Sequence, residues 1–183
     1  MASKITIPDL KKIRVTDPLF SHYAGMVAKK MIPVQWEILN GKQGQSRCFC
    51  IDNFRIAGGT LQGEHRGVVF GDTDAYKWLE AVAYCANNGE TEYIPQADEL
   101  IEIIGQAQQP DGYLDTYFIA AEPEHKWQNL TDCHEMYCAG HMTEAGVAYY
   151  QATGKTKLLD ICCKLCDHID RRFGREAGKV TGI

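Results

Sequence analysis

The stretch 131–154, TDCHEMYCAGHMTEAGVAYYQATG, constrains the fold most because polar side chains recur in it at helical spacing. His134 and His141 are seven residues apart, which advances an α-helix by about 700°, close to two full turns. We therefore expect both imidazoles on one face of a single helix over 131–153, about 10 Å apart, with Tyr137 on the same stripe. Such a face is typical of a polar, ligand-lined cavity, and the alternative is hydrogen-bonded histidines in a packed helix.

The length and charge of the chain restrict its class. Its 183 residues suit one domain, 1–183, with an extended lead-in over 1–15. A net charge of −5 without a Lys/Arg cluster argues against nucleic acid or an anionic membrane as partner. No run of about 18 apolar residues and no apolar leader segment is present, so we expect a cytoplasmic protein. Eight cysteines in such a chain are expected to be free thiols.

Helix signals recur along the sequence. Asp17 followed by Pro18 is typical of a helix start, and Pro33 should kink or break the helix predicted over 19–40. The other main helices are predicted at 75–88, 97–108, 131–153 and 156–173, with a short one at 53–57.

The segments between the helices contain little that indicates a sheet. The sequence PDG at 110–112 is typical of a turn, and 113–118 is expected to be a brief strand or a loop at the edge of a pocket. A strand-like VVF occurs at 68–70. Because period-2 alternation is never sustained, the predicted class is all-α, with helical hairpins at 74–107 and 134–173.

Several spacings could suit a metal ion, but each has a simpler interpretation. His134, Cys138 and His141 span about 10 Å, which is too wide for one tetrahedral zinc ion. The cysteine pair at 48–50 has no second pair at zinc-ribbon spacing. The cysteines at 162–166 lie on a leucine-bearing helix, where thiols usually pack as small hydrophobes. We therefore predict no metal site and no cofactor in this chain.

Carboxylates that could serve in acid–base chemistry are scattered along the sequence. Hydrolysis of a glycoside needs two such groups at a defined separation, and the spacing pairs none of them. Asp72 and Asp111 are more simply explained as turn and capping residues. We assign no catalytic residue. The candidate carboxylates are Asp72, Asp74, Glu80, Asp111, Asp115, Glu135 and Glu144.

Longer segments carry a more specific signal. The chain contains, in this order, QWEILN (35–40), NFRIAGG (53–59), GVVFGDTDAYKWLEAVAY (67–84), AQQPDGYLDTYF (107–118) and HEMYCAGHMTEAGVAYYQATGK (134–155). Together these segments resemble the amino-terminal part of glycoside hydrolase family 127, typified by bacterial β-L-arabinofuranosidase. The resemblance extends from about Val15 to Gly178.

The resemblance implies that the helical hairpins form the first part of an (α/α)6 barrel around a sugar pocket. It implies that His134 and His141 contact sugar hydroxyls, without indicating which is closer, and with Tyr137 they are our substrate-binding candidates. It also implies a zinc-bound cysteine nucleophile and a glutamate acid/base in the full-length enzyme, with the zinc held by further cysteines and a glutamate. All of these are expected beyond residue 183, and none of the eight cysteines here falls in that motif.

Two functions of different classes follow from the sequence. The first is part of a glycosidase acting on L-arabinofuranosides or related sugars, inactive by itself. The alternative is a helical binding module that forms a homodimer through the uncovered face of an incomplete barrel. A cysteine-rich metal binder is a third possibility. The sequence does not specify the natural substrate, its anomer or the oligomeric state.

Overall fold

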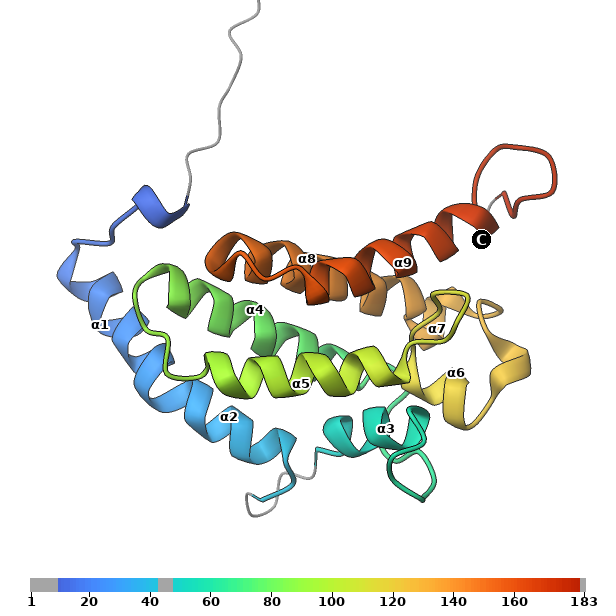
Figure 1. Cartoon of the computed structure of the whole chain (residues 1–183), viewed down its shortest axis with the longest axis horizontal. Helices are drawn as coiled ribbons and strands as arrows, with labels where there is room; N and C mark the ends of the chain where they lie inside the picture. The colour runs from blue at the N-terminus through green and yellow to red at the C-terminus, as the bar shows by residue number, and fades with distance from the viewer. Residues whose placement is uncertain (1–9, 43–47, 182–183) are drawn as a thin grey trace, which may run out of the picture.

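The computed structural model describes residues 10–42 and 48–181, and these residues form α-helices joined by loops (Figure 1). In chain order the α-helices are α1 Pro18–Met26, α2 Ile32–Leu39, α3 Cys50–Ala57, α4 Thr73–Asn87, α5 Ile94–Ala107, α6 Thr116–Ala120, α7 Leu130–Cys133, α8 Glu135–Thr153 and α9 Lys157–Arg172. The 3-10 turn η1 Leu10–Lys12 precedes α1, the π-helical segment η2 Val27–Met31 joins α1 to α2, and the 3-10 turn η3 Pro123–His125 lies between α6 and α7.

The predicted all-α class is confirmed, whereas the strand-like segments are not strands. In the described ranges, β-type pairing is limited to an isolated bridge between Phe173 and Val180. The VVF at 68–70 lies in turns, and 113–118 leads into the short helix α6. Val69 of the first segment packs in one apolar cluster with Tyr113, Tyr117 and Phe118 of the second, and packing of this kind overrides a weak intrinsic preference for strand.

The amino-terminal helices begin where the sequence predicts. Asp17 Oδ1 accepts a hydrogen bond from the Phe20 amide at 3.0 Å, and Pro18 occupies the first turn of α1. Pro33 does not end the helix. The π-helical segment η2 directly precedes it, and the changed hydrogen-bond pattern there accommodates a proline that has no N–H to donate. Part of the expected lead-in over 1–15 lies outside the described residues, and its described part contains η1 rather than extended chain alone.

The predicted hairpins form two layers. The α8–α9 hairpin is antiparallel, since Gly146 lies against Cys162 while Thr143 approaches Cys166. Between hairpins the helices run parallel: Lys77 and Glu80 on α4 meet residues 137 and 141 on α8, in the same order. In Figure 1, α4 and α5 lie beneath α8 and α9. Successive antiparallel hairpins with parallel equivalent helices are the arrangement of an α/α barrel.

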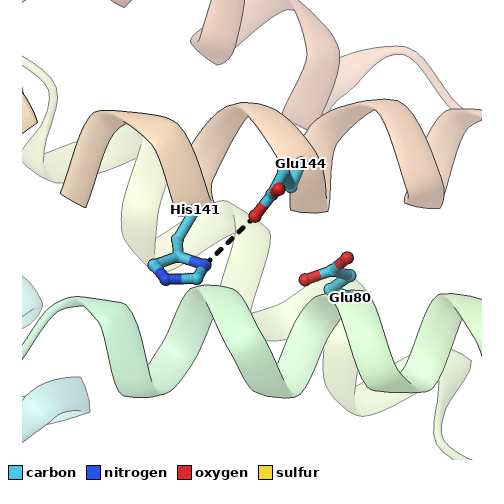
Figure 2. A group of neighbouring side chains, drawn as sticks. All are labelled: Glu80, His141 and Glu144. Carbon is cyan, nitrogen blue, oxygen red and sulfur yellow. Dashed lines mark ion pairs between the residues drawn. The ribbon is translucent and has the colours of Figure 1, made fainter. Parts of the chain in front are cut away.

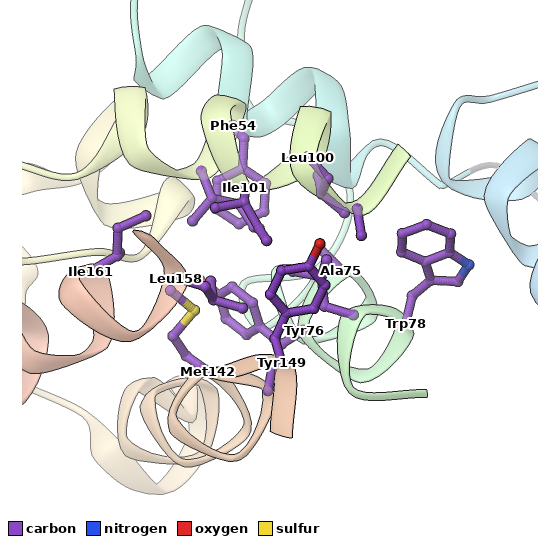
Figure 3. Packing of buried hydrophobic residues seen from close by; sticks show 14 of the residues in the cluster. Phe54, Ala75, Tyr76, Trp78, Leu100, Ile101, Met142, Tyr149, Leu158 and Ile161 are labelled. Atoms are coloured by element: carbon purple, nitrogen blue, oxygen red, sulfur yellow. The ribbon is translucent and has the colours of Figure 1, made fainter. Parts of the chain in front are cut away.

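The hydrophobic core lies where α4, α5, α8 and α9 meet (Figure 3). Leu79, Leu100, Met142 and Leu158 come from these helices in turn, and each is at most 1% exposed. Burying each such side chain contributes about 1.5–3 kcal/mol. This packing holds the two hairpins together and fixes which faces of α4 and α8 remain outside.

The cysteines of α9 divide between core and surface. Cys162 is 2% exposed, as predicted, and its Sγ contacts the Met142 carbonyl oxygen at 3.1 Å. Cys166, which the helical spacing places inside, is exposed, because the buried stripe of α9 runs through Leu158, Ile161 and Leu165 and turns away from it.

The single helix predicted over 131–153 is wrong at one residue. His134 has a left-handed backbone, φ 60° and ψ 26°, so that α7 ends at Cys133 and α8 begins at Glu135. The carboxylate of Glu135 accepts hydrogen bonds from Tyr113 Oη at 2.6 Å and from the Trp127 amide at 2.8 Å. These buried bonds anchor the first turn of α8 to the preceding loop, and the chain turns sharply at His134 to reach them.

Gly112, in the predicted turn, offers a test of the hairpin contact. Its φ is +92°, and a Cβ there would lie 2.3 Å from the carbonyl oxygen of Lys164 on α9. We expect Gly112→Ala to lower the free energy of unfolding by about 3 kcal/mol through backbone strain plus this clash. Urea denaturation followed by circular dichroism measures the loss.

Gly89→Ala is the matched control. Gly89 has φ +95°, but a methyl group added at its Cα would meet nothing within 4 Å, so this variant reports backbone strain alone, about 1 kcal/mol. Equal losses for the two variants would contradict a close approach of the 110–112 turn to α9.

Candidate functional site

A row of polar and aromatic side chains, some exposed and some partly buried, follows the junction of α4 and α8. We call this row the α4–α8 strip, and it consists of Lys77, Glu80, Tyr137, His141 and Glu144. Lys77 Nζ donates to Tyr137 Oη at 2.8 Å, and the Tyr137 and His141 rings meet edge to face with centroids 4.5 Å apart. His141 Nδ1 lies 3.2 Å from Glu144 Oε2. The parallel packing of α4 on α8 therefore aligns side chains distant in sequence into one surface.

His134 extends the strip at the start of α8. Its ring centroid lies 6.0 Å from that of Tyr137 and 5.0 Å from that of Phe70, which precedes α4. The imidazole is half-buried. Although His134 is not inside the helix, the structure brings together all three predicted binding residues, His134, Tyr137 and His141.

An open groove of about 610 Å³ runs beside the strip between α8 and the end of α9. Tyr137 borders it and is 45% exposed. Cys138, which lies between the two histidines in the sequence, is 2% exposed and belongs to the core, so its thiol is absent from this face. The residues that line the groove are Met136, Tyr137, Ala139, Gly140, His141, Thr143, Glu144 and Ile169.

A second hollow, of about 370 Å³, lies on the other side of Lys77, between α2 and α4. Asp74 and Cys48 border it, and the Cys48 Sγ lies 3.7 Å from Asp74 Oδ2. Lys77 borders this hollow and also contacts Tyr137, which borders the groove. Its ammonium is the cationic member of the strip and lies 5.1 Å from the Tyr137 ring centroid, in cation–π contact.

Lys77 is the strip residue that sequence reasoning missed. Asp74, Lys77, Glu80 and Tyr84 recur every three or four residues along α4, which is the signal of one polar helix face. In the sequence, Glu80 is an isolated carboxylate. The alignment of this face with that of α8 depends on helix packing, so neither Lys77 nor Glu80 could be paired from the sequence.

Three of the candidate carboxylates are buried among the described residues, away from the groove. Asp72, Asp115 and Glu135 are each at most 2% exposed. Asp72 occupies the N-cap position of α4, but its carboxylate does not cap that helix. It accepts instead from the Thr116 amide at 2.8 Å and from Thr116 Oγ1 at 2.5 Å. These carboxylates join α4, α6 and α8, which corrects the capping role predicted for Asp72.

Burial changes the pKa values of Asp72 and Asp115. Removal from water raises the pKa of Asp72 to about 6, against the hydrogen bonds from Thr116 that lower it. Burial, and then the charge of Asp72, raise the pKa of Asp115 well above its usual range. Asp115 Oδ2 has no hydrogen-bond partner among the described residues, whereas Oδ1 accepts from the Phe118 amide at 3.3 Å. Because Asp72 and Asp115 repel each other electrostatically, the ionised form of one disfavours ionisation of the other.

The thiols of the core are poorly placed for nucleophilic chemistry. Burial raises the pKa of Cys162 to about 12 and raises the pKa of Cys138 far above its usual range. The zinc implied by the family resemblance needs cysteines and a glutamate. Within 10–42 and 48–181, the convergent set of metal-ligating side chains consists of Glu80, His141 and Glu144 and contains no cysteine. These residues do not fit that zinc, and we derive no step through it.

The helices also bear on membrane association. None of those in the described part of the chain combines the length and the apolar character needed to cross a bilayer.

The parallel hairpins and the open polar strip define the class of the protein. Tyrosine and histidine rings beside a groove, with a lysine and carboxylates within reach, suit a polyhydroxylated ligand better than an apolar one. The fold is that of part of an α/α-barrel domain, and the α4–α8 strip is its candidate site for a polar ligand.

Comparison with known proteins gives the family. The family model of the GH127 β-L-arabinofuranosidase catalytic domain matches residues 12–183. The chain therefore belongs to the GH127 family, and its helical hairpins are part of an (α/α)6 barrel.

Individual relatives agree with this assignment. The non-reducing end β-L-arabinofuranosidase of Bifidobacterium longum subsp. longum is 35% identical over 93% of this chain. The solved GH127 β-L-arabinofuranosidase Ara127N of Geobacillus stearothermophilus T6 superposes with a TM-score of 0.89 and 48% identity over 92% of the chain. The GH127 β-arabinofuranosidase BT3674 superposes with a TM-score of 0.83 and 27% identity over 96% of the chain. The chain spans 29%, 27% and 28% of their respective lengths.

The raised pKa of Asp72 predicts a pH-dependent stability. The folded state holds a proton on Asp72 up to about pH 6, whereas the unfolded chain releases it near the usual 3.8. The stabilisation is therefore complete below pH 3.8 and is lost as pH rises toward and through 6. We expect Asp72→Asn to reduce the fall in the free energy of unfolding over this window, as measured by urea denaturation at several pH values.

Asp167→Asn serves as the control, because Asp167 is exposed on α9. It should leave the pH profile as in the original chain. An unchanged slope in Asp72→Asn would show that Asp72 does not hold a proton in the folded state.

Proposed function

We propose that this chain is the amino-terminal part of the barrel of a glycoside hydrolase that acts on L-arabinofuranosides or related sugars, and that the α4–α8 strip with His134 binds the sugar. The observation that carries this proposal is the convergence of His134, Tyr137 and His141 beside an open groove. The family supports the substrate class, since its relatives are named as β-L-arabinofuranosidases.

The chemistry of these side chains suits a furanoside. A tyrosine ring packs against the C–H face of a sugar, while imidazole nitrogens donate to or accept from its hydroxyls. Lys77 adds a donor that is already oriented by its bond to Tyr137 Oη.

The proposal places the nucleophile, the acid/base and the zinc of the full-length enzyme outside these 183 residues. The buried carboxylates and the core thiols described above support this division, because they are withdrawn from the groove. We further propose a cytoplasmic location, which the free thiols of all eight cysteines favour.

Binding and hydrolysis can be tested on the same preparation. We expect the purified chain to bind methyl β-L-arabinofuranoside and to release no arabinose from an aryl β-L-arabinofuranoside. Tyr137→Ala should weaken binding about tenfold, because it removes both the stacking ring and the partner of Lys77. NMR titration measures the affinity, and release of the aryl group reports hydrolysis.

Tyr150→Ala provides the control, since Tyr150 is a similarly exposed tyrosine on α8, 43% against 45% for Tyr137, and does not line the groove. Its affinity should equal that of the unmodified chain. Equal weakening in both variants would locate the sugar elsewhere, and measurable hydrolysis would contradict the division of the catalytic groups.

Self-association is a second candidate function, favoured by an exposed apolar face. Large apolar side chains along α1, η2 and α2 project away from α4, and Phe20 is the most exposed of them at 65%. Such a face commonly marks an interface. Its members are Leu19, Phe20, Tyr23, Met26, Met31 and Val34.

The oligomeric state tests this candidate directly. If the α1–α2 face mediates a homodimer, sedimentation equilibrium gives a dimer whose dissociation constant rises at least about tenfold in Phe20→Asp, because a charge is then placed on the apolar face. Leu61→Asp introduces the same charge at an exposed leucine outside this face. A monomer at all concentrations would exclude self-association.

A further inference from the structure

The α4–α8 strip contains a cluster whose chemistry differs from sugar recognition. Glu80 projects from α4, and His141 and Glu144 project from α8 into the same space (Figure 2). We propose that Glu80, His141 and Glu144 bind a divalent first-row transition metal ion, with Zn²⁺ as the preferred occupant.

The distances support a common ligand. The potential ligand atoms of the three residues all lie within 4.8 Å of one another, and His141 Nδ1 is 3.2 Å from Glu144 Oε2. Ligands bound tetrahedrally to zinc at about 2.1 Å are about 3.4 Å apart. The pair on α8 already has this separation, and a rotamer change of about 1.5 Å in Glu80 would complete the set.

The imidazole has a nitrogen that the fold leaves unused. His141 Nδ1 is buried and makes no hydrogen bond within the described residues, although it lies close to Glu144. The contact between the two is an ion-pair distance without hydrogen-bond geometry. An unpaired ring nitrogen that faces two carboxylates has the orientation of a metal ligand, and a bound cation would satisfy it.

The surroundings of the cluster favour a cation. Tyr84 Oη donates to Glu80 Oε1 at 2.9 Å and thereby orients this carboxylate, as an outer-shell partner does. In the described part of the chain, neither Glu80 nor Glu144 forms an ion pair with a lysine or arginine. The negative charge is therefore not neutralised locally.

The donor set selects the metal. One imidazole and two carboxylates suit Zn²⁺ and its neighbours, whereas Mg²⁺ and Ca²⁺ prefer all-oxygen sites. Glu144 is 62% exposed in its side chain, so solvent can fill the remaining positions. The set contains no cysteine, and His141 is its only member in common with the triad His134, Cys138 and His141. The proposed site depends on the contact between α4 and α8, which could not be predicted from residue spacing.

Titration with the metal alone tests the site independently of sugar binding. After chelator treatment, the chain should bind one equivalent of Zn²⁺ in isothermal calorimetry and bind Mg²⁺ at least about a hundredfold more weakly. His141→Asn and Glu144→Gln should each weaken Zn²⁺ binding about a hundredfold, and Tyr84→Phe about tenfold through loss of the orienting bond. Circular dichroism verifies that each variant is folded. If His141→Asn does not fold, Glu144→Gln still tests the site, because Glu144 is exposed.

His125→Asn is the matched control. His125 Nδ1 also lies near two glutamates, 2.9 Å from Glu122 Oε2 and 3.9 Å from Glu124 Oε1, but it is hydrogen-bonded to Glu122. His125→Asn should leave the Zn²⁺ affinity unchanged. Cys163 and Cys166 are exposed and could bind the metal ion instead. The absorption spectrum of the Co²⁺ complex distinguishes the two cases, because sulfur ligands give a charge-transfer band. A sulfur charge-transfer band, unchanged affinity in Glu144→Gln, or no stoichiometric binding would overturn the proposal.

Discussion

The parallel packing of α4 on α8 is the interaction on which the rest of the structure depends. Alanines on both helices are buried, Ala75 and Ala83 on α4 and Ala145 and Ala148 on α8, and short side chains leave room for close approach of helix axes. The same packing that buries these alanines turns the polar residues of both helices outward on one side. One contact therefore generates both the centre of the core and the α4–α8 strip.

Buried polar bonds determine the details that hydrophobic packing leaves open. Glu135 anchors the first turn of α8 to Trp127 and Tyr113, while Asp72 connects the start of α4 to Thr116. Unpaired groups of this kind would be costly in the interior, so these bonds set where each helix begins. The position of His134 follows from them, since it occupies the turn that Glu135 imposes.

Local signals were sufficient for much of the fold. The Asp17–Pro18 start of α1 agrees with the sequence, because capping depends on neighbours a few residues away. The break at His134 could not be predicted, because it is caused by a carboxylate bonded to Tyr113, 22 residues earlier. In the site, His134, Tyr137 and His141 were identified from their own helix, whereas Lys77 and Glu80 required knowledge of which helix packs against it.

The sequence by itself determined the all-α class, the helical hairpins and the membership of the GH127 family, since periodicity, caps and long motifs are properties of the linear chain. The tertiary structure alone decided which polar residues share a surface. It withdrew Cys138, Asp72 and Asp115 into the interior and joined Glu80 to His141. The physical reason is that burial and side-chain convergence depend on the relative register of two helices, and this register is set by packing between residues that are far apart in the chain.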